Sequence, residues 1–279
     1  LYGDSGLPNQ AGPLAPDKII LRDGWTPDAA YLLLNLRFTG WHRYKATNAV
    51  TLIYQDGPLA ADALGSASYN WLPVGRSVFR DKRIPRENLN GLLVGRSGMS
   101  TVVYGLTGVG GPWAQDPPRY VEVVEFEVGR ELDLAHTRLR DWRGWEYDRW
   151  VYLYHNSGPI VVADEALGPQ GGQGALVWHL IGEQALEGKR IRLSSDDRRI
   201  DVLFVPLGLE GRFEVKEAQD GDSGLRVVYY APPDGRLRVV TLFLLGSWAG
   251  AEAGFDTDRQ TLWIATEQAR VTLPLWSID

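Results

Sequence analysis

Residues 135–164 read AHTRLRDWRGWEYDRWVYLYHNSGPIVVAD and contain the clearest secondary-structure pattern in the chain. A lead-in with basic side chains spaced along one strand is followed by a second strand in which aromatic and apolar residues alternate. A third strand ends at Asp164, after a turn at residues 156–159 that contains Gly and Pro. Three such strands in succession predict a β-meander.

The rest of the chain repeats this kind of pattern. Strands are expected at residues 49–54, 120–128 and 237–245, with Gly- and Pro-containing turns between them, and helical periodicity is scarce. Many strands joined by Gly-rich turns predict an all-β fold, a large two-sheet antiparallel β-sandwich of the supersandwich-like kind. Residues 1–17 are expected to be a linker or N-terminal arm and residues 18–279 the sandwich. A smaller satellite sheet from about residue 182 is the alternative.

Composition limits the classes of function. The chain has 279 residues, 44% of them hydrophobic, which suffices for a sizeable core. Its net charge of −6 argues against nucleic acid as a partner. The absence of Cys excludes disulfides and thiolate metal sites, and no apolar run is long enough to predict a membrane span. Because the sequence opens at Leu1 without Met, we expect it to be the C-terminal piece of a longer protein.

Tryptophan is unusually frequent, with 11 copies. Large rings of this kind fill the cores of β-sandwiches, and on surfaces they also stack against the faces of sugar rings. A core position is the expectation for most of them.

A short loop concentrates the side chains that suit an acidic sugar. Trp41, His42, Arg43, Tyr44 and Lys45 follow one another just before the strand expected at residues 49–54. Tyr and His are side chains that transfer protons in eliminations, and Arg and Lys can neutralise a uronate carboxylate. The loop therefore predicts a site for an acidic sugar. The alternative is a solvated loop with one buried ring.

The pattern over roughly residues 18–182 resembles the C-terminal sandwich domain of the heparinase II/III-like polysaccharide lyases. The segments that carry the resemblance are Ile20–Trp25, the meander at 135–164 and Trp178–Leu180. The family's Gly-His-x-His-x-Asp segment before a strand, with its following turn, is similar in frame to residues 42–62 here. Its later His-Asn-Thr is similar in place to Leu89–Gly91.

The resemblance also implies roles for single residues. It places Tyr44, or His42 after a small loop shift, at the catalytic histidine. The second histidine falls at Ala46 and the aspartate at Asn48. The family's metal ligands fall at Ala46, Leu89 and Asp62, of which only Asp62 can ligate. One carboxylate does not make a structural zinc site, so we expect no zinc and no other cofactor.

The function implied by the resemblance is that of the sandwich portion of a polysaccharide lyase, acting on or binding uronate-containing polysaccharide by β-elimination chemistry. In the family an N-terminal helical domain supplies further catalytic residues, so this chain alone is expected to be inactive, and whether it is an enzyme stays open. The alternative is an inactive carbohydrate-binding or structural scaffold module. The resemblance favours a bacterial protein in the periplasm or outside the cell.

A second basic feature lies on the meander. Arg138 and Arg140 are two residues apart and therefore share one face of a strand. Together they can clamp a sulfate or carboxylate with bidentate hydrogen bonds. The alternative is pairing with interleaved carboxylates such as Asp141 and Asp148, and the density of these acids favours it. The chain's histidines show no metal-binding spacing.

Overall fold

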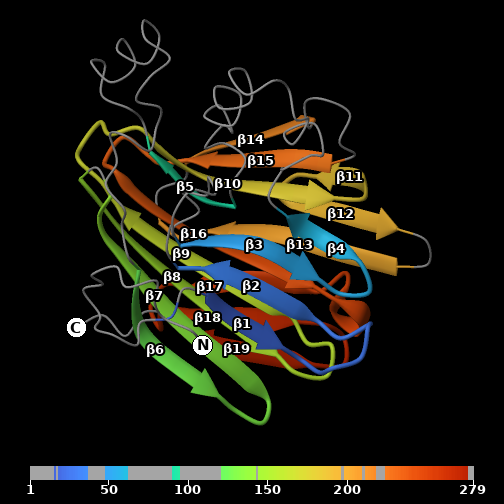
Figure 1. The fold of residues 1–279 in the computed structure, drawn as a ribbon. Coiled ribbons are helices and arrows are strands. Elements are labelled where there is room, and N and C mark those ends of the chain that lie inside the picture. Colours follow the sequence, from blue (N-terminus) through green and yellow to red (C-terminus); the bar gives the residue numbers. More distant parts are fainter. Residues whose placement is uncertain are drawn as a thin grey trace, which may run out of the picture.

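The computed structural model describes residues 16, 18–36, 48–61, 90–94, 121–142, 144–195, 198–208, 211–217 and 224–275. The described residues form β-strands, joined by turns and one short 3-10 helix at Gly246–Trp248. Two eight-stranded antiparallel sheets lie face to face, with a small third sheet behind them (Figure 1). The predicted all-β, two-sheet antiparallel sandwich is confirmed.

The first sheet runs in the order β1-β2-β3-β4-β10-β15-β14, with β5 also paired to β10. Its strands are β1 (Lys18–Arg22), β2 (Tyr31–Asn35), β3 (Ala49–Tyr54), β4 (Pro58–Ala61), β5 (Gly91–Val94), β10 (Gly174–Ile181), β14 (Arg212–Glu217) and β15 (Gly224–Tyr230). The strand expected at residues 49–54 is β3. The turn after it is built on Asp56 and Gly57, both at positive φ.

The second sheet runs in the order β11-β12-β13-β16-β9-β8-β7-β6. Its strands are β6 (Glu122–Val128), β7 (Leu132–Trp142), β8 (Trp145–Tyr154), β9 (Ile160–Leu167), β11 (Glu183–Glu187), β12 (Arg190–Ser195), β13 (Arg198–Pro206) and β16 (Arg236–Leu244). The predicted meander is β7-β8-β9, paired antiparallel strand to strand. Asn156 and Ser157 form its second turn in the left-handed region, at φ 58° and 57°.

Alternate side chains of the two large sheets meet to form the main core. Trp145 and Trp178 are almost completely buried there, as the abundance of Trp predicts for core rings. The Trp145 ring lies directly against Gly168 and Gly174, where a Cβ atom would overlap it. These two glycines are required by the close approach of the ring.

The third sheet covers the outer face of the second one. It consists of β17 (Glu252–Asp256), β18 (Thr261–Ala265) and β19 (Arg270–Pro274). Its Leu262, Ile264 and Leu273 pack with Val161 and Leu242 of the second sheet in a separate apolar cluster. Strands β9 and β16 are therefore buried on both faces, which explains why they are apolar with little alternation.

Strand β6 departs from its sequence prediction. The regular alternation of Val and Glu over residues 120–128 predicts one wet and one dry face, yet Val124, Phe126 and Val128 are all exposed. The reason is position, since β6 is the last strand of its sheet and, of its apolar residues, Val123 packs against the main core while Val124, Phe126 and Val128 do not.

Within the described part of the chain, the structure contains no helix of the length and apolarity that a membrane crossing requires.

Candidate functional site

A buried ion pair lies at the centre of the sandwich. Arg149 of β8 donates from Nε to Oδ1 of Asp164 on β9 over 2.7 Å, and both side chains are fully buried. The Tyr147 hydroxyl donates to the same carboxylate oxygen, also over 2.7 Å. The Arg149 guanidinium additionally lies 5.5 Å from the ring of Trp178 on the facing sheet.

The environment fixes the charge states of this group. Burial alone would lower the pKa of Arg149, but the adjacent Asp164 carboxylate and Tyr147 together outweigh it, so the pKa is raised. Burial raises the pKa of the Tyr147 hydroxyl well above its usual range, and Arg149 opposes this only in part. At neutral pH Arg149 is therefore charged and Tyr147 is a neutral hydrogen-bond donor.

The same guanidinium also holds two segments of the first sheet. Nη1 of Arg149 donates to the backbone carbonyl oxygen of Asn48 over 2.9 Å and to that of Asn90 over 3.0 Å. Asn48 has φ 58°, and its Oδ1 accepts a 2.7 Å hydrogen bond from Thr137 of β7. Asn90 accepts from the backbone N–H of His179 at Oδ1 and donates from Nδ2 to the Val50 carbonyl. One side chain of the second sheet thus fixes Asn48 and Asn90 together.

The hydrogen bonds of Asn48 fix the chain shortly after the predicted binding loop Trp41–Lys45. Trp41, His42, Arg43, Tyr44 and Lys45 lie outside the described residues, so their proposed roles stay predictions. Asn48 is described, and it marks the point at which the chain enters β3 after that loop. The point of entry is fixed by hydrogen bonds to both Arg149 and Thr137.

The backbone carbonyl oxygens of Asn48 and Asn90 lie close in sequence to the positions at which the family's metal ligands align. The carbonyl oxygens of both residues already accept hydrogen bonds from a guanidinium cation, and the nearby Asp164 carboxylate is paired with the same cation. Among the described residues no group of three His, Cys, Asp or Glu side chains is arranged to hold a metal. Positions 46, 62 and 89 lie outside the described residues, and the absence of zinc stays a prediction.

Arg138 and Arg140 point to the outer face of the second sheet, as their spacing predicts. Arg138 donates from Nε to Asp148 Oδ1 over 2.7 Å, and that oxygen also lies 2.7 Å from Nε2 of His136. Arg140 forms an exposed ion pair with Glu122 at 3.2 Å. Both guanidiniums thus have carboxylate partners on neighbouring strands; the Arg138–Asp148 pair is one that the interleaved acids favoured, whereas Glu122 lies outside the meander. A role for either in substrate binding remains a prediction.

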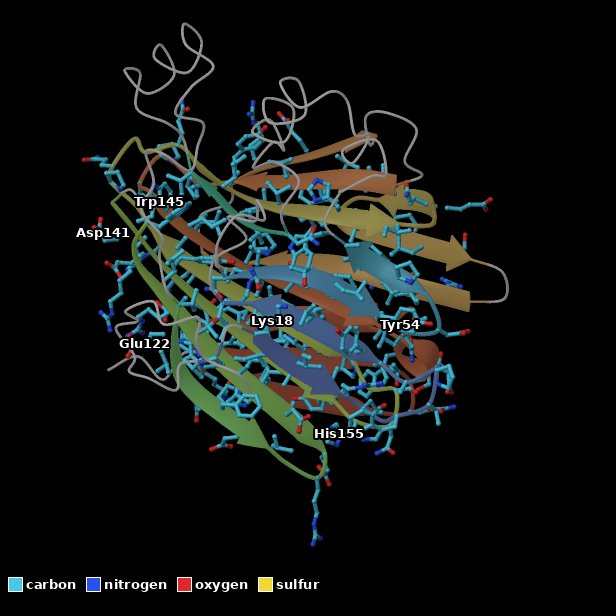
Figure 2. All side chains as sticks on the ribbon, viewed as in Figure 1. Lys18, Tyr54, Glu122, Asp141, Trp145 and His155 are labelled. Atoms are coloured by element: carbon cyan, nitrogen blue, oxygen red, sulfur yellow. The ribbon has the colours of Figure 1, made fainter. Side chains whose placement is uncertain are left out.

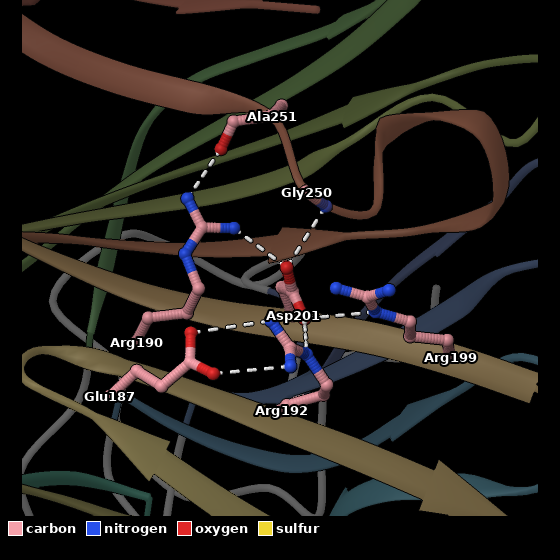
Figure 3. A network of polar contacts seen from close by, with 7 residues as sticks. All are labelled: Glu187, Arg190, Arg192, Arg199, Asp201, Gly250 and Ala251. Atoms are coloured by element: carbon pink, nitrogen blue, oxygen red, sulfur yellow. Dashed lines mark hydrogen bonds and ion pairs between the residues drawn. The ribbon is translucent and has the colours of Figure 1, made fainter.

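A second buried carboxylate joins the third sheet to the second. Asp201 of β13 accepts hydrogen bonds from Arg190 and from the backbone N–H of Gly250, at 2.6 and 2.9 Å (Figure 3). Arg190 also donates to the carbonyl oxygen of Ala251 over 2.6 Å. Arg192 and Arg199 lie on the other carboxylate oxygen at 3.4 and 4.0 Å. The cluster fixes the connection that leads into β17.

The chain superimposes on a heparinase III with a TM-score of 0.66 at 14% identity, over 94% of this chain and 41% of that one. For the heparan sulfate lyase HepC from Pedobacter heparinus the TM-score is 0.67 at 12% identity, over 95% and 42%. The chain has the fold of a heparinase III sandwich.

That likeness confirms, as a matter of fold, the resemblance to the heparinase II/III-like sandwich. No family model and no curated protein matches the chain. The chain spans about two fifths of the length of the heparinase III and HepC chains, and it matches their C-terminal domain. The heparinase-like architecture thus extends beyond residue 182, where the sequence resemblance ended.

Proposed function

We propose that this chain is the sandwich portion of a heparinase II/III-like polysaccharide lyase and that it binds uronate-containing polysaccharide through the loop Trp41–Lys45. The observation that carries the proposal is the fixed position of Asn48, the residue at which this loop re-enters a sandwich of heparinase III fold. A rigid attachment limits the conformations of a binding loop and so lowers the entropy cost of binding.

The chemistry of the loop defines the ligand class. Arg43 and Lys45 offer cations for the carboxylates of an acidic chain, and Trp41 offers a face for a sugar ring. Tyr44 or His42 is the candidate for proton transfer in an elimination. Catalysis also requires a helical domain of the same parent protein as partner, so the chain alone binds without turnover.

Binding of a uronate oligosaccharide to the full chain tests the proposal. The double variant Arg43→Ala/Lys45→Ala should weaken binding at least about tenfold, since charge-assisted hydrogen bonds contribute roughly 1.5–3 kcal/mol each. Arg236→Ala/Arg259→Ala removes two exposed cations elsewhere and serves as the matched control. Unchanged affinity of the loop variant would reject the site, and release of unsaturated uronate by the chain alone would reject the need for a partner domain.

One observation favours a second candidate, a non-catalytic scaffold. Arg149 cross-links the carbonyl groups of Asn48 and Asn90, next to the positions where the family's metal ligands align. This buried link strengthens the sandwich without any ligand. A wild-type chain that binds no acidic glycan at all would support the scaffold.

A further inference from the structure

Arg22, at the end of β1, has no carboxylate partner among the residues that the structure describes. Its guanidinium carbon lies 4.3 Å from the ring centroid of Trp25 and 5.5 Å from that of Tyr31. Its Nε is buried, and no described residue accepts a hydrogen bond from it. Within the described part of the chain the terminal nitrogens Nη1 and Nη2 have no hydrogen-bond partner either, and these nitrogens, unlike the buried Nε, are the donors that an anion can reach.

Trp25 is the most exposed large apolar side chain among the described residues, at 86%. The turn that carries it is nevertheless well fixed. The Asp23 backbone N–H donates to Ala30 over 2.9 Å. The Asp23 carboxylate accepts 2.8 Å hydrogen bonds from the backbone N–H groups of Asn156 and Ser157. An indole ring displayed on a fixed turn is a ready surface for stacking.

Two tyrosines extend this surface across the first sheet. Arg22 is the register partner of Tyr31, which in turn is the partner of Tyr54 on β3, so the three side chains share one face. Their neighbours Leu21 and Leu32 are buried in the main core, which places the three on the outer face. Figure 2 shows Tyr54 at the end of β3 beside the β1–β2 turn.

We propose that the Arg22–Trp25 patch, consisting of Arg22, Trp25, Tyr31 and Tyr54, binds a uronate residue of an acidic glycan. The sugar ring packs against the exposed edge of Trp25 beside the guanidinium, and its carboxylate accepts two parallel hydrogen bonds from Nη1 and Nη2 of Arg22. The two neighbouring rings limit where the guanidinium can lie, which suits bidentate binding of a carboxylate.

The patch is separate from the loop Trp41–Lys45, although the proposal takes its ligand class from the proposed function. Strand β2 runs from Tyr31 in the patch to Asn35, about 13 Å at 3.3 Å per residue. The connection that contains the loop follows Asn35 in the sequence.

The test is calorimetric titration of the full chain with a uronate hexasaccharide and with its carboxyl-reduced form. Trp25→Ala and Arg22→Met should each weaken binding of the uronate at least about tenfold, the factor that corresponds to 1.4 kcal/mol. Arg22→Lys, which keeps the charge and loses the fork, should give an intermediate affinity. Arg22→Met should leave the affinity for the carboxyl-reduced sugar unchanged.

A matched control is available on the third sheet. Arg270 lies over the Trp263 ring at 5.5 Å, and Arg270→Ala should change uronate affinity less than twofold. Circular dichroism and melting temperature establish that each variant is folded. If Arg22→Met does not fold, Trp25→Ala and Arg22→Lys decide the outcome.

Comparison with Arg43→Ala/Lys45→Ala separates the two proposals. Loss of binding in the patch variants alone supports this inference and rejects the loop site. Loss in the loop variant alone overturns the inference and leaves the loop site standing. Equal losses of Arg22→Met for both sugars would reject the carboxylate contact, and a wild-type chain that binds neither sugar would overturn both proposals.

Discussion

Arg149 and Asp164 form an ion pair in which neither side chain is exposed and Nε lies 2.7 Å from Oδ1. The pair joins β8 to β9 within one sheet, and through Asn48 and Asn90 it also reaches the other. A buried charge is costly unless it is paired and hydrogen-bonded, so the consequences of breaking this pair are predictable.

Replacing Arg149 by Met should lower the free energy of unfolding by about 3–5 kcal/mol, because it leaves the Asp164 carboxylate buried without its cation. Urea unfolding measures the change. The double variant Arg149→Met/Asp164→Leu should lose less than the sum of the two single variants, since it removes both charges. As a control, Arg140→Ala breaks the exposed pair with Glu122 and should cost less than about 1 kcal/mol. A loss of similar size in Arg149→Met would contradict the prediction.

Replacing Asp201 by Asn should loosen the attachment of the third sheet. The substitution keeps the shape of the side chain but removes the charge that holds Arg190 and binds the Gly250 N–H. We expect a loss of about 1–3 kcal/mol, the range for an imperfectly satisfied buried polar group. Hydrogen exchange should accelerate in β17–β19 before it does in β7–β9. The control is Glu187→Gln, which removes the exposed carboxylate that pairs with Arg192. Uniform acceleration of hydrogen exchange throughout the chain in Asp201→Asn would refute a local role.

Replacing Gly174 by Ala should destabilise the fold by about 1–3 kcal/mol, the usual cost of overpacking a core. The added methyl group would overlap the Trp145 ring, which is buried and has no room to move aside. Gly24→Ala, where the nearest atom would lie at an ordinary 3.4 Å, is the matched control. Thermal unfolding of both variants checks the prediction, and equal melting temperatures would show that the ring can shift.

His155 should make stability depend on pH. Burial alone would lower its pKa, but the Asp133 carboxylate at 3.2 Å from Nε2 and the Arg130 carbonyl outweigh it, so the pKa is raised. A raised pKa means that the folded state binds the proton more tightly. The stabilisation is therefore complete below the unfolded value of about 6.5 and is lost as pH rises through the folded value.

The measurement compares wild type with His155→Gln. The difference in free energy of unfolding should be larger at pH 5.5 than at pH 8.5, with wild type the more stable protein at the lower pH. Asp133→Asn should reduce this pH dependence, since it removes the neighbouring charge. A difference that is constant with pH would show that His155 does not titrate as expected.

The sequence was sufficient to predict those strands whose position depends only on the type and periodicity of their side chains. The meander at β7-β8-β9 and strand β3 follow from alternation and from turns whose positive φ angles suit Asn and Gly. The exposure of β6 could not be foreseen, because an edge strand and a half-buried inner strand have the same alternation. Which strand is at the edge depends on the order of strands in the sheet, and that order is set by long-range pairing.

The central network shows a similar limit. Both Arg138 and Arg149 belong to the meander, yet Arg149 lies on the inner face of the sheet and Arg138 on the outer one. The only local signal was that Arg149 shares its strand face with Tyr147 and Val151, both buried. Its partners Asn48 and Asn90 are 101 and 59 residues away, and a contact at that separation is not visible from one sequence.

The third sheet also has a consequence for synthesis. Strands β9 and β16 are complete once residue 244 has been made, but the apolar face that they share with Tyr152 is covered by residues 252–275. A nascent chain therefore displays an apolar surface until residues 252–275 have been synthesised and have folded onto it. During this interval the two large sheets can already pack face to face, but the uncovered outer face of the second sheet is prone to association with other chains. Strands β17–β19 cover this surface, and once they have folded the exposed apolar area that promotes aggregation is buried.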